Sequence, residues 1–186
     1  MLLFINACVR GESRTKLLAD ALLEKLNEPF EELRLEEIDF PKVDEAFLHE
    51  RDRLIAAEEF SAPIFALARQ FANAERIVIA APYWDLSFPA SLKQYFELVN
   101  ALGVTFRYTP EGFPQGLCRA KELFYISTAG GSFTPEEFGY GYIKALANGF
   151  YGIEKTRLFM AKGLDIVGAD AEAILDECIE KIQNEV

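Results

Sequence analysis

Short apolar runs alternate along this chain with segments in which apolar residues recur at helical spacing. The apolar or extended runs predict strands at residues 2–5, 31–35, 76–81, 123–128 and 156–160. The helical spacing predicts helices at residues 17–26, 62–74, 91–101, 135–150 and 170–182. Because right-handed crossovers return each helix over the sheet, this alternation predicts an α/β fold with a parallel sheet and helices on both faces.

Two segments interrupt the alternation. Residues 41–60, which begin at a proline, predict a helical excursion that could serve as a lid or a dimer arm. Residues 103–117 are rich in aromatic side chains and contain a turn at 110–112, so we expect a surface hairpin or lid there. The chain of 186 residues suits one domain, spanning 1–186, and five strands favour the flavodoxin-like order 2-1-3-4-5.

The charge of the chain excludes several classes of partner. A net charge of −11 repels phosphate backbones and anionic membranes, and Lys and Arg are dispersed, so we expect neither nucleic-acid nor membrane binding. One tight basic group, formed by Arg10, Arg14 and Lys16, has the right size for a single phosphate. The apolar start at residues 1–5 is too short for a membrane span or an export signal.

The cysteines and the single histidine of the sequence favour neither a metal site nor a disulfide framework. Three cysteines without CxxC spacing support neither a disulfide framework nor a thiolate metal site, and they favour a reducing, cytoplasmic setting. The single histidine, His49, lies in a charged helical stretch and is expected at the surface. We therefore expect no metal and no Ser-His-Asp triad.

Ligands of open parallel sheets bind at the carboxyl ends of the strands, which directs attention to the loops after the first, third and fourth strands. The first loop offers hydroxyls, arginines and free amides at a helix start, as a phosphate cradle would: Arg10, Ser13, Arg14 and Thr15. An ordinary serine N-cap with surface arginines explains the same residues equally well.

The other two loops suit a flat ring system. The second loop, with Pro82, Tyr83, Trp84, Asp85 and Leu86, predicts a rigid apolar wall, although its aromatics could instead cover the core. In the third loop, glycines let backbone amides approach a ligand edge closely; its candidate residues are Thr128, Ala129, Gly130 and Gly131.

Three segments, 4–15, 81–85 and 103–112, resemble the FMN-dependent NADH azoreductase and NAD(P)H:quinone oxidoreductase family. The resemblance implies a flavodoxin-like homodimer with one FMN per subunit near the interface. It assigns residues 13–15 to the FMN phosphate, 83–86 to the isoalloxazine, and 128–131 to the other edge of that ring. The chain departs from the family at Ala7, where a small hydroxyl residue is frequent nearby, at Asp85, where Asn is frequent, and at Ala129, where Arg is frequent.

These loops contain no histidine and no evident catalytic acid, so we expect the flavin to carry the chemistry without a catalytic side chain. NADH or NADPH would deliver hydride, and a quinone or azo compound would then occupy the same slot, which implies ping-pong kinetics. The predicted acceptor pocket comprises Phe106, Tyr108, Phe113 and Phe133; for the first three, core or dimer packing is a nearly equal explanation.

Two other functions remain open at this point. An acidic electron carrier of the flavodoxin type would bind FMN but dock on protein partners, and a degenerate protein of the same fold would bind no cofactor and act only through interactions. The aromatic segment 103–117 favours the enzyme over the carrier, because a carrier needs an exposed flavin edge.

Overall fold

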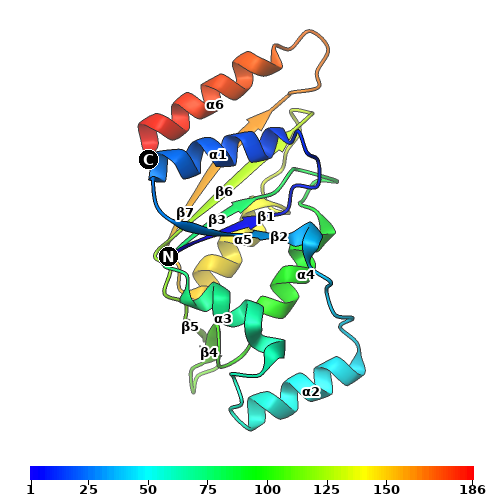
Figure 1. The fold of residues 1–186 in the computed structure, drawn as a ribbon, viewed down its shortest axis with the longest axis vertical. Coiled ribbons are helices and arrows are strands. Elements are labelled where there is room, and N and C mark those ends of the chain that lie inside the picture. Colours follow the sequence, from blue (N-terminus) through cyan, green and yellow to red (C-terminus); the bar gives the residue numbers. More distant parts are fainter.

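The computed structural model describes residues 1–186 and contains a five-stranded parallel sheet at its centre (Figure 1). The strands are β1 (Leu2–Asn6), β2 (Phe30–Arg34), β3 (Arg76–Ala80), β6 (Glu122–Ala129) and β7 (Lys155–Lys162), in the order β2-β1-β3-β6-β7. Counting only these strands, the order is 2-1-3-4-5. The predicted fold class and strand order are therefore confirmed.

Helices cover both faces of the sheet. On one face lie α1 (Arg14–Leu26) and α6 (Ala171–Glu185); on the other lie α3 (Ala66–Asn73), α4 (Ala90–Val99) and α5 (Tyr140–Leu146) (Figure 1). Alternate side chains of the central strands enter the two layers, as Phe4 and Ile5 do on β1. Since strands buried on both faces need apolar residues at every position, the sequence shows them as continuous apolar runs.

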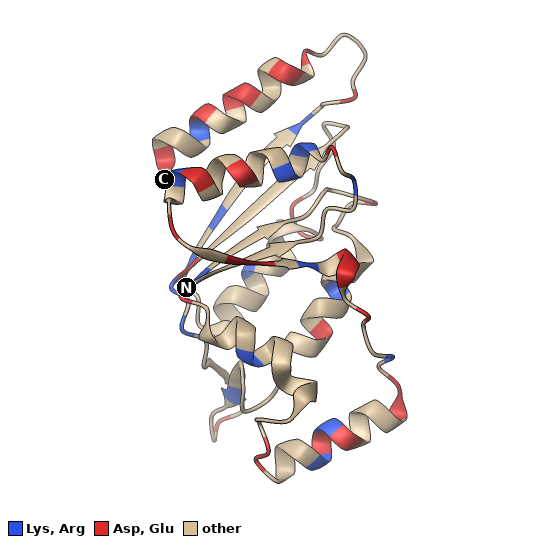
Figure 2. Cartoon of the chain, viewed as in Figure 1, with Lys and Arg blue, Asp and Glu red and all other residues tan.

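Charged side chains are excluded from this core. Lys and Arg are interspersed with Asp and Glu over α1, α2 (Glu45–Ala56) and α6 (Figure 2). Short 3-10 turns at Leu35–Glu37 and Pro63–Phe65 flank α2, which projects from the body and packs through Leu54 against a small apolar cluster. No helix combines the length and the apolar character that crossing a membrane requires.

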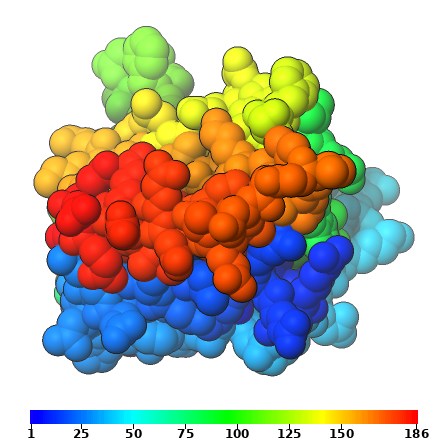
Figure 3. All heavy atoms as spheres, turned by 90° about the horizontal axis from the view of Figure 1, so that it is seen from above, coloured from blue at the N-terminus to red at the C-terminus, as the bar shows by residue number.

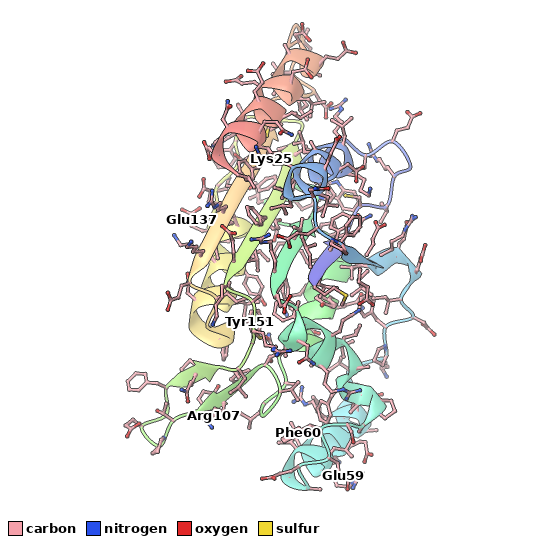
Figure 4. All side chains as sticks on the ribbon, turned by 60° about the vertical axis from the view of Figure 1, so that its left-hand side comes forward. Lys25, Glu59, Phe60, Arg107, Glu137 and Tyr151 are labelled. Carbon is pink, nitrogen blue, oxygen red and sulfur yellow. The ribbon has the colours of Figure 1, made fainter.

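A small antiparallel hairpin, β4 (Phe106–Tyr108) and β5 (Pro114–Gly116), lies at the amino end of the sheet. Gly116 approaches the backbone so closely that a Cβ atom there would lie 2.1 Å from the carbonyl carbon of Tyr151. Figure 4 shows the hairpin, marked by Arg107, projecting from the body below Tyr151. This packing fixes the hairpin at the end of the molecule opposite the carboxyl ends of the strands.

The helix predicted at 135–150 differs from the observed one. Helix α5 begins only at Tyr140, and its last turn, Ala147–Tyr151, widens into a π-helix. The preceding residues instead supply carbonyl groups to the second loop: Tyr83 Oη donates to Pro135 O at 3.0 Å, and Ser87 Oγ donates to Phe138 O at 2.5 Å. These tertiary hydrogen bonds hold the start of the predicted helix in a non-helical conformation.

Candidate functional site

A cavity of about 320 Å³ lies at the carboxyl ends of β1, β3 and β6. Its walls come from the three predicted loops and from a fourth, the β7–α6 loop. The lining residues are Val9, Arg10, Glu12, Ser13, Arg14, Thr15, Pro82, Tyr83, Trp84, Thr128, Ala129, Gly130, Leu164 and Asp165. Figure 3 shows the β7–α6 segment (orange) next to the β1–α1 segment (blue) at one end of the molecule.

The first loop ends in a capped helix. Ser13 has extended backbone angles, φ −86° and ψ 119°, and its Oγ accepts a hydrogen bond from Lys16 N at 3.3 Å. The backbone N–H groups of the first turn of α1 therefore face the cavity end of the helix, where the helix dipole favours an anion. The serine is both an N-cap and a cavity residue, so the two explanations of this loop are compatible.

A pair of hydroxyls joins the first loop to the third. Thr15 is buried, and its Oγ1 lies 2.6 Å from Oγ1 of Thr128. The third loop is in turn joined to the second, since Tyr83 N donates to Thr128 O at 2.9 Å. The three loops are thus one connected wall.

The second loop turns sharply. Asp85 and Leu86 have positive φ angles of 49° and 68°, and Trp84 and Ser87 exchange two backbone hydrogen bonds of 3.0 and 2.8 Å. This is the geometry of a two-residue hairpin turn, which holds the indole of Trp84 at the cavity with 39% of its surface exposed. Tyr83 lines the cavity beside it, and partial burial raises the pKa of its hydroxyl.

Several predicted residues stand outside the cavity lining. Asp85 and Leu86 are exposed at the tip of the turn, and Gly131 lies beyond the wall formed by Gly130. The four predicted pocket aromatics are also absent from the lining. Phe106 is buried against Phe150, at 4.6 Å between ring centroids.

The predicted surface hairpin is present, but it lies at the end of the sheet opposite the cavity of its own chain. Its side chains Tyr108 and Phe113 are 53% and 69% exposed there, and Phe133, on the third loop, is 76% exposed. None of these three contributes to the cavity wall.

Sequence reasoning missed four lining residues: Val9, Glu12, Leu164 and Asp165. Asp165 is the most consequential, because its Oδ1 accepts a hydrogen bond from Arg14 Nη1 at 2.8 Å. Asp165 could have been predicted from the sequence, because it follows the fifth parallel strand. Ligands of open parallel sheets bind at the carboxyl ends of the strands, and this applies to every strand of the sheet.

Comparison with known proteins identifies the family of this chain. The family described as having a flavodoxin-like fold matches residues 1–186. An FMN-dependent NADH:quinone oxidoreductase of Clostridium perfringens is 38% identical over 192 residues, covering 96% of this chain and 94% of its own. The chain belongs to the family of FMN-dependent NADH:quinone oxidoreductases. Another member, from Clostridium beijerinckii, is 37% identical over 185 residues, covering 95% and 91% of the two chains.

Solved structures give the same fold. An azoreductase from Bacillus anthracis str. Sterne superposes with a TM-score of 0.86 at 24% identity, covering 99% of this chain and 97% of that one. An FMN-dependent NADH-azoreductase from B. anthracis str. Ames Ancestor, solved in complex with FMN, superposes with a TM-score of 0.79 at 22% identity, covering 99% and 96%. The family resemblance noted in the sequence is confirmed.

Proposed function

We propose that this family member binds FMN in the cavity and catalyses electron transfer from NADH to quinones or azo compounds. The observation that carries the proposal is the convergence, at one sheet end, of a capped helix start, two arginines and an aromatic wall. NADPH is a second possible donor. The names of the relatives support FMN, NADH and a quinone acceptor.

The cavity residues fit FMN. Arg10 and Arg14, with the first amides of α1, provide the positive charge and the donors that a phosphate monoester needs. Tyr83 and Trp84 offer an apolar surface for a planar ring. On the other side of the cavity, Gly130 has no Cβ atom. A Cβ atom there would lie 2.2 Å from Oδ2 of Asp165. The volume lies at the lower end of the usual range for ligand pockets, about 300–1,000 Å³.

Bound FMN would supply the hydride chemistry, which leaves binding and orientation to the protein. No histidine lines the cavity. Donor and acceptor would occupy the same slot in turn, beside the flavin ring that Tyr83 and Trp84 hold, so the kinetics should be ping-pong. Parallel double-reciprocal plots of NADH against quinone are expected, and intersecting lines would exclude a single shared slot.

The place of the hairpin supports the proposal that the protein is a homodimer. Tyr108 and Phe113 are exposed, and they cannot reach the cavity of their own chain from the amino end of the sheet. We propose that the hairpin covers the cavity of a partner subunit, where its aromatics, together with Phe133 of the third loop, complete the acceptor pocket.

The phosphate site is tested by charge reversal. Arg14→Glu combined with Thr15→Ala should weaken FMN binding strongly, because each charge-assisted hydrogen bond lost costs about 1.5–3 kcal/mol. Arg53→Glu, on α2 and outside the cavity lining, is the control. Flavin fluorescence reports the affinity. Unchanged affinity in the double variant would refute the phosphate assignment.

A separate measurement distinguishes the enzyme from a flavodoxin-type electron carrier. The enzyme should oxidise NADH in the steady state with a quinone as acceptor, and a carrier should not.

A further inference from the structure

Asp165 places a negative charge in a cavity whose arginines suit a negatively charged ligand. Its Oδ1 accepts a hydrogen bond from Arg14 Nη1 at 2.8 Å. Its Oδ2 lies over the third loop, where a Cβ atom on Gly130 would come within 2.2 Å of that oxygen. One carboxylate therefore contacts both the helix start and the loop across the cavity.

Main-chain hydrogen bonds fix the backbone that carries this carboxylate. Three consecutive N–H groups of the β7–α6 loop donate to carbonyl oxygens of the third loop: Gly163 to Gly131 at 3.0 Å, Leu164 to Ala129 at 3.2 Å, and Asp165 to Gly130 at 2.9 Å. The ion pair itself adds little to folding, since the side chains of Arg14 and Asp165 are 45% and 67% exposed. Because these main-chain bonds fix the backbone of Asp165, its carboxylate stays within reach of Arg14 when a ligand arrives.

The charges in the cavity wall cancel. Arg10 and Arg14 carry two positive charges, and Glu12 and Asp165 carry two negative charges. A phosphate monoester carries about −1.5 to −2 charges at pH 7 and seeks the same guanidinium donors that Asp165 engages. A phosphate at the start of α1 therefore meets both a competitor for Arg14 and a like charge.

Building on the proposed binding of FMN, we propose that Asp165 competes with the flavin phosphate for Arg14 and thereby sets the preference of the site for FMN over riboflavin. The carboxylate weakens phosphate binding and so favours exchange of the cofactor. Riboflavin lacks the phosphate, so its affinity is insensitive to this residue. Asp165 is thus a specificity-determining residue that tunes affinity through Arg14.

The test compares two ligands in one variant. Asp165→Asn keeps the shape of the side chain and removes its charge, and quenching of flavin fluorescence at low ionic strength gives both dissociation constants. We expect the Kd for FMN to fall about threefold to tenfold and the Kd for riboflavin to stay unchanged. Glu172→Gln removes the same charge from the first turn of α6, outside the cavity lining, and should change neither constant.

A second variant pair tests the route through Arg14. In an Arg14→Gln background, Asp165→Asn should produce a smaller gain in FMN affinity, because the contested donor is gone. An equal gain in both backgrounds, an equal gain for riboflavin, or weaker FMN binding in Asp165→Asn would each overturn the inference. Failure of the wild-type protein to bind FMN would instead overturn the proposed function, on which this inference depends.

Discussion

Among the individual residues, Thr15 and Thr128 form a short side-chain link between the first and third loops of the cavity. Their hydroxyl oxygens lie 2.6 Å apart, and Thr15 is buried while Thr128 is partly buried. A buried hydroxyl that loses its partner retains its desolvation penalty, whereas removing both hydroxyls removes the penalty as well. The pair is thus expected to behave as a unit.

Thr15→Val should therefore lower the free energy of unfolding by about 1–3 kcal/mol, since it leaves the Thr128 hydroxyl without its partner. Adding Thr128→Val should cost less than the sum of the two single variants. Urea unfolding of the wild type, both single variants and the double variant measures this coupling. Strict additivity would show that the two hydroxyls do not stabilise each other.

Among the elements, the β4–β5 hairpin has the strongest expected link to function. Phe113 is 69% exposed at its tip, in a position that only another molecule can cover. In the proposed homodimer, this side chain borders the acceptor pocket of the partner subunit.

Phe113→Ser should thus lower kcat/KM for quinones while the affinity for FMN is retained, because the phosphate site lies at the other end of the subunit. Leu17→Ser, at a 48% exposed position of α1 outside the cavity lining, is the matched control. Steady-state kinetics and sedimentation velocity are the measurements. A fully active wild-type monomer with flavin bound would contradict the shared pocket.

The elements also show which features of the structure could be predicted from the sequence and which could not. The central strands were predictable because burial on both faces leaves continuous apolar runs. The rule that ligands bind at the carboxyl ends of the strands brought Ser13, Tyr83 and Thr128 together. Contacts between residues distant in sequence were not predictable. The packing of Gly116 on Tyr151 places the hairpin away from the cavity, and the Arg14–Asp165 pair joins residues 151 positions apart.

For the whole molecule, the three cysteines are buried and free. Burial raises the pKa of the Cys118 thiol to about 12 from the usual 9.0, and it also raises the pKa values of Cys8 and Cys178. A raised pKa in the folded state means that the fold favours the protonated thiol. The contribution of the Cys118 thiol to stability is complete below pH 9 and is lost as the pH rises toward 12.

The free energy of unfolding should therefore decrease above pH 9, by about 1.4 kcal/mol per pH unit for Cys118 alone. Urea unfolding at a series of pH values from 8 to 11 measures the decrease. In Cys118→Ala the slope should be shallower, whatever the absolute stability of that variant. An identical slope would mean that this thiol does not titrate with unfolding.

The order of the cavity loops along the chain has a consequence for biosynthesis. The first loop is translated more than a hundred residues before the third, and Asp165 follows later still. On the ribosome, β1 pairs with β3 only after β3 has emerged from the exit tunnel, and the wall opposite Arg14 forms after β6 and β7 have joined the sheet. With FMN bound in this cavity, as proposed, cofactor loading is therefore expected only after Asp165 has been synthesised.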